Sequence, residues 1–136
     1  MDEKPIILLI DDEPGILETY KMAFSYHGMD VLTASDGKEG LVKAKDAMPD
    51  AIVVDLMMPN LNGKQFIREI RENSDLKNVP ILVCTALGEE LEKNEALAAG
   101  ATDYFVKTES DPYKLVASVE KALGHEATHT EEKDAK

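Results

Sequence analysis

Short runs of apolar residues, rich in β-branched side chains, recur along the chain, and most of them end in a polar residue. The runs cover residues 6–10, 30–34, 51–54, 80–84 and 103–106. A short continuous apolar run bounded by turn residues is typical of a strand that is buried on both faces, as in a parallel sheet. The apolar part of the run at 30–34 is shorter and the run is more polar, which indicates an edge strand.

Apolar residues at helical spacing fill the segments between these runs. Capping and stop residues give the boundaries of the predicted helices, which lie between Pro14 and Gly28, between Asp36 and Pro49, after Asn62, between Glu89 and Gly100, and between Asp111 and Gly124. The second helix carries Leu41, Ala44 and Met48 and stops before Pro49, and the third has Phe66, Ile67 and Ile70 as its inner face. The fourth offers only Leu91, Leu97 and Ala98, so we expect it to be the least firmly packed.

Strands and helices thus alternate five times, which predicts a parallel sheet with helices on both faces. We expect an α/β fold of the (βα)5 type, with a doubly wound parallel five-stranded sheet in the order 2-1-3-4-5. This order places the fully apolar strands inside the sheet. Residues 1–124 form the predicted domain, and residues 125–136 form a polar tail that we expect to be disordered. His125 and His129 would suit a metal only if this tail were helical, and a solvated terminus is the preferred interpretation.

Charge and composition narrow the classes of partner. The formal net charge of -12 and the scattered basic residues argue against nucleic acid, which needs a clustered basic face. The apolar run at 6–10 is far too short to span a membrane or to form the core of a signal peptide. The one cysteine, Cys84, cannot form an internal disulfide, and we interpret it as a small core residue. We therefore expect a cytoplasmic protein without a membrane or nucleic-acid partner.

Four of the predicted strands lead directly into particular polar residues. They are Asp11 and Asp12 after the first strand, Asp55 after the third, Thr85 after the fourth and Lys107 after the fifth. A strand that leaves the core must end in something polar, so any one of these positions alone carries little information. Together they carry more, because parallel strands lie ~5 Å apart and bring their carboxyl ends to one edge of the sheet. We expect these side chains to converge.

Three carboxylates in one pocket repel each other by roughly 4 kcal/mol per close pair at 4 Å and an effective dielectric constant of 20. Either one of them is protonated or a cation lies among them. Oxygen ligands without histidine or cysteine favour a hard ion, and Mg²⁺ in particular. A carboxylate, a divalent ion, an ammonium group and a hydroxyl group suit phosphoryl transfer. Asp55 is central and is followed by a loop, which makes it the natural nucleophile.

These residues resemble the receiver domain of two-component response regulators, of the kind found in chemotaxis. The resemblance covers residues 5–124, and the motifs that carry it are Asp11-Asp12, the stretch from Asp55 to Gly63 with Pro59, the pair Thr85-Ala86, and Lys107. It implies that a histidine kinase or a phosphotransfer protein donates a phosphoryl group, and that Asp55 accepts it as a phosphoaspartate. It also implies Mg²⁺ as cofactor, with Asp12 binding directly, Asp11 mainly through water, and Asp55 and the backbone carbonyl of Met57 completing the ligands.

The resemblance further assigns Lys107 and Thr85 to the phosphoryl oxygens. Tyr104 falls at the family's aromatic switch position, where it would turn inward as Thr85 moves, and so reshape the surface of the fourth helix, fifth strand and fifth helix for a protein target. The chain departs from the family pattern after Lys107, where Thr108 replaces the common proline, whose bond is often cis. A monomer, or a dimer that depends on phosphorylation, would be consistent with this family.

Two other functions stay open. A Mg²⁺-dependent phosphohydrolase would use Asp55 to turn over phosphate esters, but Met57 occupies the place where such an enzyme carries its acid. A pseudo-receiver would keep the fold as a binding module without the chemistry. The preferred interpretation is a phosphoacceptor signalling domain that catalyses its own phosphoryl transfer and autodephosphorylation and is not a conventional enzyme.

Overall fold

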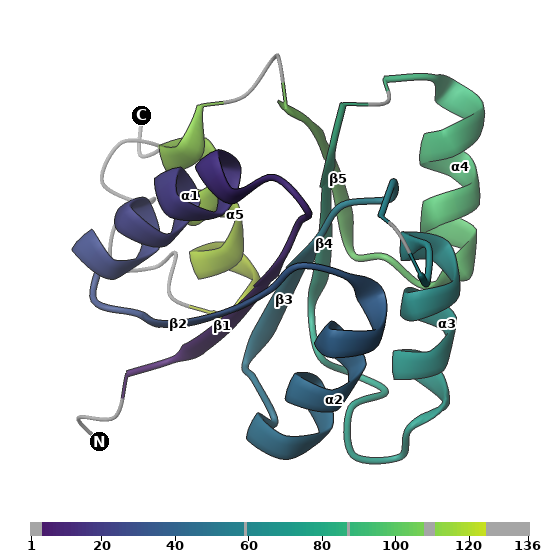
Figure 1. Ribbon diagram of the computed structural model, residues 1–136, viewed down its shortest axis with the longest axis horizontal. Coiled ribbons are helices and arrows are strands. Elements are labelled where there is room, and N and C mark those ends of the chain that lie inside the picture. Colours follow the sequence, from purple (N-terminus) through teal and green to yellow (C-terminus); the bar gives the residue numbers. More distant parts are fainter. Residues whose placement is uncertain (1–3, 59, 87, 108–110, 125–136) are drawn as a thin grey trace.

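The computed structural model describes residues 4–58, 60–86, 88–107 and 111–124. Its centre is a five-stranded parallel sheet in the order β2-β1-β3-β4-β5. The strands are β1 (Ile6–Ile10), β2 (Asp30–Ala34), β3 (Ala51–Val54), β4 (Ile81–Thr85) and β5 (Asp103–Val106). The helices are α1 (Pro14–Tyr26), α2 (Gly37–Ala47), α3 (Gly63–Glu72), α4 (Glu90–Ala99) and α5 (Pro112–Ala122). This confirms the predicted fold class and strand order (Figure 1).

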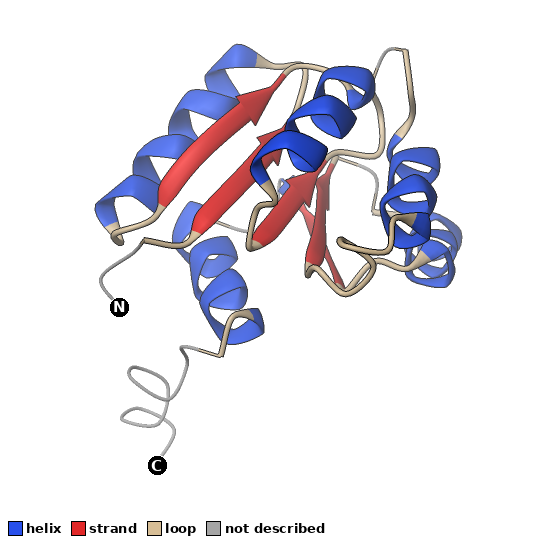
Figure 2. Cartoon of the chain, turned by 90° about the horizontal axis from the view of Figure 1, so that it is seen from below, coloured by secondary structure: helices blue, strands red, loops and turns tan. Residues whose placement is uncertain are grey.

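Helices cover both faces of the sheet, with α1 and α5 on one side and α2, α3 and α4 on the other (Figures 1 and 2). Successive residues of a strand point to opposite faces, so each inner strand contributes to two separate cores. In β3, Ile52 and Val54 pack toward α2 and α3, while Ala51 and Val53 pack toward α1 and α5. Strands that are buried on both faces must be apolar at every position, which is why β1, β3 and β4 were recognisable.

The predicted caps are confirmed. The side chains of Asp36, Asn62 and Asp111 each accept a hydrogen bond from the backbone N–H three residues further on, at the starts of α2, α3 and α5. Pro14 and Pro112 lie in the first turns of α1 and α5, where the missing N–H of proline leaves no partner unsatisfied.

The predicted inner face of α4 is wrong. Leu91 is 64% exposed, Leu97 is 38% exposed and Ala98 is exposed as well, while Ala96 is the buried residue of this helix. Leu91 and Leu97 are six residues apart and hence about 120° apart around a helix, so they cannot share one buried stripe. The expectation that α4 is the least firmly packed helix is consistent with this burial pattern.

Met48, which the apolar pattern assigns to the second helix, does not pack inward with Ala44. This residue ends α2 in a left-handed conformation with φ of 52°, and its side chain is 42% exposed. The turn that lets the chain reach Pro49 therefore rotates Met48 away from the core.

Some predictions concern residues outside the described part of the chain. These are the tail at 125–136 with His125 and His129, and the peptide bond between Lys107 and Thr108. None of the helices in the described ranges combines the length and hydrophobicity that a membrane crossing requires.

Candidate functional site

The candidate site lies at the carboxyl-terminal edge of the sheet. Asp11 follows β1 directly, Asp55 follows β3, Thr85 is the last residue of β4, and Lys107 follows β5. The backbone N–H of Asp55 donates to the carbonyl of Ile10 at 3.1 Å, which continues the pairing of β1 and β3 to this edge. The topology thus brings these predicted site residues to one edge of the sheet.

Lys107 is the centre of an ionic cluster. Its Nζ lies 2.7 Å from Oδ2 of Asp11 and 3.0 Å from Oδ2 of Asp55. A third carboxylate, that of Glu13, lies 3.2 Å away. Glu13 was not singled out from the sequence, although it directly follows the aspartate pair, and it is more exposed than the two aspartates. One ammonium group therefore joins the ends of β1, β3 and β5.

Burial controls the protonation of this cluster. Asp11 and Asp55 are each 5% exposed. Burial raises the pKa of Asp11, although the hydrogen bonds from Lys107 and from the backbone N–H of Glu13 partly oppose this effect. Burial lowers the pKa of Lys107, but its bonds with Asp11 and Asp55 outweigh burial and raise that pKa above its ordinary value. Lys107 therefore stays charged at neutral pH.

The carboxylates suit a divalent cation. Ligand oxygens from Asp11, Asp12 and Asp55 all lie within 4.8 Å of one another, and Asp12 is exposed while the other two are buried. Because Lys107 brings one positive charge to these three carboxylates, the site retains excess negative charge. An all-oxygen donor set with one side open to water fits Mg²⁺, which keeps several of its waters when bound. The residues present therefore fit the ion that the sequence implied.

The loop after β3 orients Asp55. The backbone N–H of Met57 donates to Oδ1 of Asp55 at 3.2 Å, which leaves Oδ2 to Lys107. The Met57 side chain itself is 59% exposed. Further along this loop, the side-chain amide of Asn60 donates to Asp36 at 2.8 Å, a tie to the start of α2 that the sequence did not reveal.

Gly63 permits the close packing of this loop. A Cβ atom there would lie 2.5 Å from the backbone oxygen of Asp55 and 2.7 Å from Cα of Leu56. The backbone N–H of Gly63 also donates to the carbonyl of Leu56 at 3.0 Å. The loop therefore folds back against the backbone of Asp55, and any side chain at position 63 would push it away.

Thr85 and Tyr104 were both predicted to take part in the switch. Thr85 is fully buried at the end of β4. Tyr104, in β5, is half-buried and packs against the core beneath α2, α3 and α4. Burial raises the pKa of its hydroxyl, and the nearby carboxylates of Glu92 and Glu89 raise it further. The strand that carries Tyr104, β5, packs against α4.

Cys84 is a core residue, as expected. It is 2% exposed, and its Sγ lies 3.3 Å from the hydroxyl oxygen of Tyr20. The two side chains line a small cavity next to Asp11 and Asp55. Burial raises the pKa of the Cys84 thiol, which keeps it protonated and unreactive.

Comparisons with known proteins agree with this geometry. Residues 7–120 match the family described as the response regulator receiver domain. The chain is 40% identical over 117 residues to the alkaline phosphatase synthesis transcriptional regulatory protein PhoP of Bacillus subtilis. That match covers 86% of this chain and 48% of PhoP. The chain is 38% identical over 124 residues to the transcriptional regulatory protein TrcR of Mycobacterium tuberculosis, and this match covers 90% of the chain and 46% of TrcR. The chain thus spans about half the length of these relatives.

Solved structures share the whole fold. The chemotaxis response regulator CheY4 of Vibrio cholerae superposes with a TM-score of 0.82 at 32% identity, over 88% of this chain and 99% of that one. The receiver domain of the Francisella response regulator 1452 has a TM-score of 0.82 at 32% identity, over 89% of this chain and 98% of that one. Since the family match extends over most of the domain, the chain belongs to the receiver domains of two-component response regulators.

Proposed function

We propose that Asp55 accepts a phosphoryl group from the phosphohistidine of a histidine kinase or of a phosphotransfer protein, in a reaction that depends on Mg²⁺. The observation that carries this proposal is the ammonium group of Lys107, held between Asp11 and Asp55 at the edge of the sheet. Phosphoryl transfer needs a positioned nucleophile and positive charge on the phosphoryl oxygens, and Asp55 with Lys107 supplies the nucleophile and part of that charge. A kinase donor would place the reaction in the cytoplasm.

The residues divide the work as follows. A carboxylate oxygen of Asp55 attacks phosphorus, the bond between phosphorus and the histidine nitrogen breaks, and that nitrogen keeps the electron pair. Lys107, already within 3.0 Å of Asp55, holds the negative charge of the transferred group. Thr85, at the end of the neighbouring strand β4, donates its hydroxyl to a phosphoryl oxygen.

Asp11, Asp12, Asp55 and the Met57 carbonyl would hold Mg²⁺, with Asp11 acting mainly through water. When bound, the ion neutralises the charge that develops on the phosphoryl oxygens. The mutual approach of the three carboxylates within 4.8 Å supports this assignment. The N–H of Met57, which bonds to Oδ1 of Asp55, orients the nucleophile at the same time.

Phosphorylation would be read out on the surface formed by α4, β5 and α5. In this proposal Thr85 moves toward the phosphoryl group and Tyr104 turns further inward, so that a downstream protein recognises the changed surface. The names of the curated relatives, both transcriptional regulators, count against the expectation that the output involves no nucleic acid. Because the chain spans about half of each relative, such an output would belong to the part that these 136 residues do not match.

The test is intact mass spectrometry after incubation with acetyl phosphate and Mg²⁺. Wild-type protein should gain the mass of one phosphoryl group, and Asp55→Asn should gain none. Asp46→Asn, which changes an exposed carboxylate on α2, should behave like wild type. Phosphorylation of Asp55→Asn, or none of the wild type, would overturn the proposal. Release of many equivalents of phosphate from a phosphate monoester would instead favour a phosphohydrolase.

A further inference from the structure

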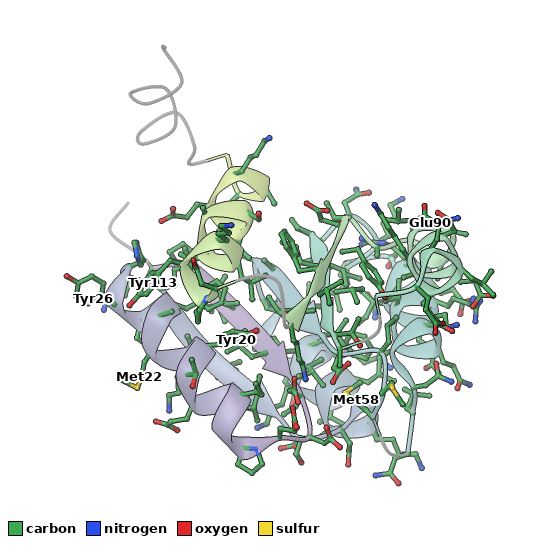
Figure 3. The ribbon with its side chains drawn as sticks, turned by 90° about the horizontal axis from the view of Figure 1, so that it is seen from above. Tyr20, Met22, Tyr26, Met58, Glu90 and Tyr113 are labelled. Carbon is green, nitrogen blue, oxygen red and sulfur yellow. The ribbon has the colours of Figure 1, made fainter. Side chains whose placement is uncertain are left out.

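Helix α4 is held to the domain by few apolar contacts. Ala96 is its buried residue, and Leu91, which could anchor its first half, is 64% exposed. The N-cap residue Glu89, which precedes α4, makes no side-chain capping bond. Figure 3 shows Glu90, at the start of α4, at the side of the molecule opposite to Met22 and Tyr26 of α1. Polar contacts therefore contribute to the position of the first half of this helix.

Gly100, which directly follows α4, is hydrogen-bonded to a side chain of α3. Nε of Arg71, near the end of α3, donates to the carbonyl of Gly100 at 2.9 Å. The same guanidinium donates to the carbonyl of Val79 at 2.6 Å. Gly100 has φ of 122°, and a Cβ atom there would lie 2.8 Å from Cγ of Arg71. Arg71 thus connects the C-terminal end of α4 to the segment between α3 and β4.

A different tie holds the first half of α4. Nζ of Lys64 lies 3.0 Å from Oε1 of Glu92 and also forms an ion pair with Glu95. These bonds, that to Glu95 first, raise the pKa of Lys64. All three side chains are partly exposed, at 24% for Lys64, 25% for Glu92 and 44% for Glu95. Ion pairs of this kind are weak and can be broken at little cost.

Lys64 is well placed to sense the state of Asp55. It is the second residue of α3 and follows Gly63, where an added Cβ atom would lie 2.5 Å from the backbone oxygen of Asp55. Lys64 also joins α3 to α4, and α4 packs against β5, the strand that carries Tyr104. The ionic cluster therefore connects the helix that follows the Asp55 loop to the helix that packs beside the strand of the proposed aromatic switch.

We propose that Lys64, Glu92 and Glu95 form an ionic latch that holds the first half of α4 against α3 in the unphosphorylated domain and that opens when Asp55 is phosphorylated. The tie between Arg71 and Gly100 then serves as the pivot about which α4 moves. The inference rests on the proposed function of Asp55. An interaction present in only one of two states biases the equilibrium toward that state by its own free energy. The latch therefore opposes phosphorylation.

The first test measures amide hydrogen exchange across α4 in the unphosphorylated protein. Lys64→Met keeps most of the side-chain stem and removes the charge, and Glu92→Gln with Glu95→Gln removes its partners. In both variants, amide exchange should be faster than in wild type across the first half of α4 and should be unchanged near Gly100. The control, Lys43→Met, removes a more exposed ion pair within α2, between Lys43 and Glu39 at 3.1 Å, together with the hydrogen bond from Lys43 to the carbonyl of Thr33, and should leave α4 unchanged. Unaltered exchange in the latch variants would refute the latch.

The second test measures affinity for beryllofluoride, a phosphoryl mimic, in the presence of Mg²⁺. Because exposed ion pairs contribute little each, the latch variants should bind about two- to fivefold more tightly than wild type and the control. The swap Lys64→Glu with Glu92→Lys should restore the affinity toward the wild-type value. Equal affinities in wild type and latch variants, or no rescue by the swap, would overturn the coupling to Asp55.

The two tests separate the two proposals. If wild-type protein neither binds beryllofluoride nor accepts a phosphoryl group, the proposed function fails and the coupling fails with it. If wild type does both while Lys64→Met behaves identically, the proposed function stands and the latch is wrong.

Discussion

Replacing Lys107 with methionine isolates the charge at the centre of the site. The substitution keeps an apolar stem of similar length and removes the ammonium group that lies 2.7 Å from Asp11 and 3.0 Å from Asp55. Both carboxylates are 5% exposed, so solvent cannot replace the lost partner. We expect the metal-free variant to be markedly less stable than wild type.

The magnitude follows from the geometry. At an effective dielectric constant of 20, the two contacts correspond to about 6 and 5.5 kcal/mol of Coulomb attraction, most of which offsets the cost of burying the charges. Removing one partner of a buried ion pair costs about 3–5 kcal/mol. Protonation of Asp11, whose pKa burial already raises, limits the loss, so we expect about 3 kcal/mol. With a slope near 1.5 kcal/mol per molar urea, the unfolding midpoint should fall by about 2 M.

Urea unfolding at neutral pH, with EDTA or with excess Mg²⁺, measures this effect. Mg²⁺ should recover at least half of the lost stability, because the ion then meets the carboxylates without competition from the ammonium group. Lys43→Met breaks an exposed ion pair with Glu39 and a hydrogen bond to the carbonyl of Thr33, so it should cost about 1 kcal/mol and show no Mg²⁺ dependence beyond that of wild type. A metal-free Lys107→Met protein as stable as wild type would refute the ionic cluster described above.

Three further predictions concern the surroundings of the site. Gly63→Ala should destabilise the domain by about 1–3 kcal/mol in urea unfolding, because the new methyl group would lie 2.5 Å from the backbone oxygen of Asp55. The control Gly15→Ala, whose methyl group would meet no atom within 4 Å, should stabilise the domain slightly. Asn62→Ala should cost about 1 kcal/mol through loss of the α3 cap, and Asn62→Asp should retain that contribution. The hydrogen bond from the backbone N–H of Ser35, followed by that from Lys43, lowers the pKa of Glu39 below its ordinary 4.5. The stabilisation that results is present above pH 4.5 and is lost as the pH falls through the lower folded value. In unfolding measurements, Glu39→Gln should therefore be less stable than wild type near neutral pH and equally stable in acid.

Most of the fold could be predicted because its signals are local. Inner strands are continuously apolar, and the caps at Asp36, Asn62 and Asp111 are read within three residues. The convergence of Asp11, Asp55 and Lys107 needed one more step, the rule that parallel strands end at a common edge. These features follow from periodicity and topology alone.

The features that escaped prediction are contacts between distant elements. Helix α4 and the residue that follows it are bonded to α3 through Lys64, 28 residues before Glu92, and through Arg71, 29 residues before Gly100, and neither pairing leaves a periodic pattern in the sequence. The bond between Asn60 and Asp36 and the approach of Glu13 to Lys107 are of the same kind. Two leucines on α4 suggested an apolar face because hydrophobicity is visible in the sequence and ionic docking is not.

The most direct test of the account is to locate the phosphoryl group chemically. Borohydride reduces an acyl phosphate of aspartate to homoserine, which peptide mass spectrometry identifies at a single position. After incubation with acetyl phosphate and Mg²⁺, wild-type protein should carry homoserine at position 55 and retain aspartate at positions 11 and 12. Homoserine at 11 or 12, or at no position of a protein that binds Mg²⁺, would contradict the role assigned to Asp55.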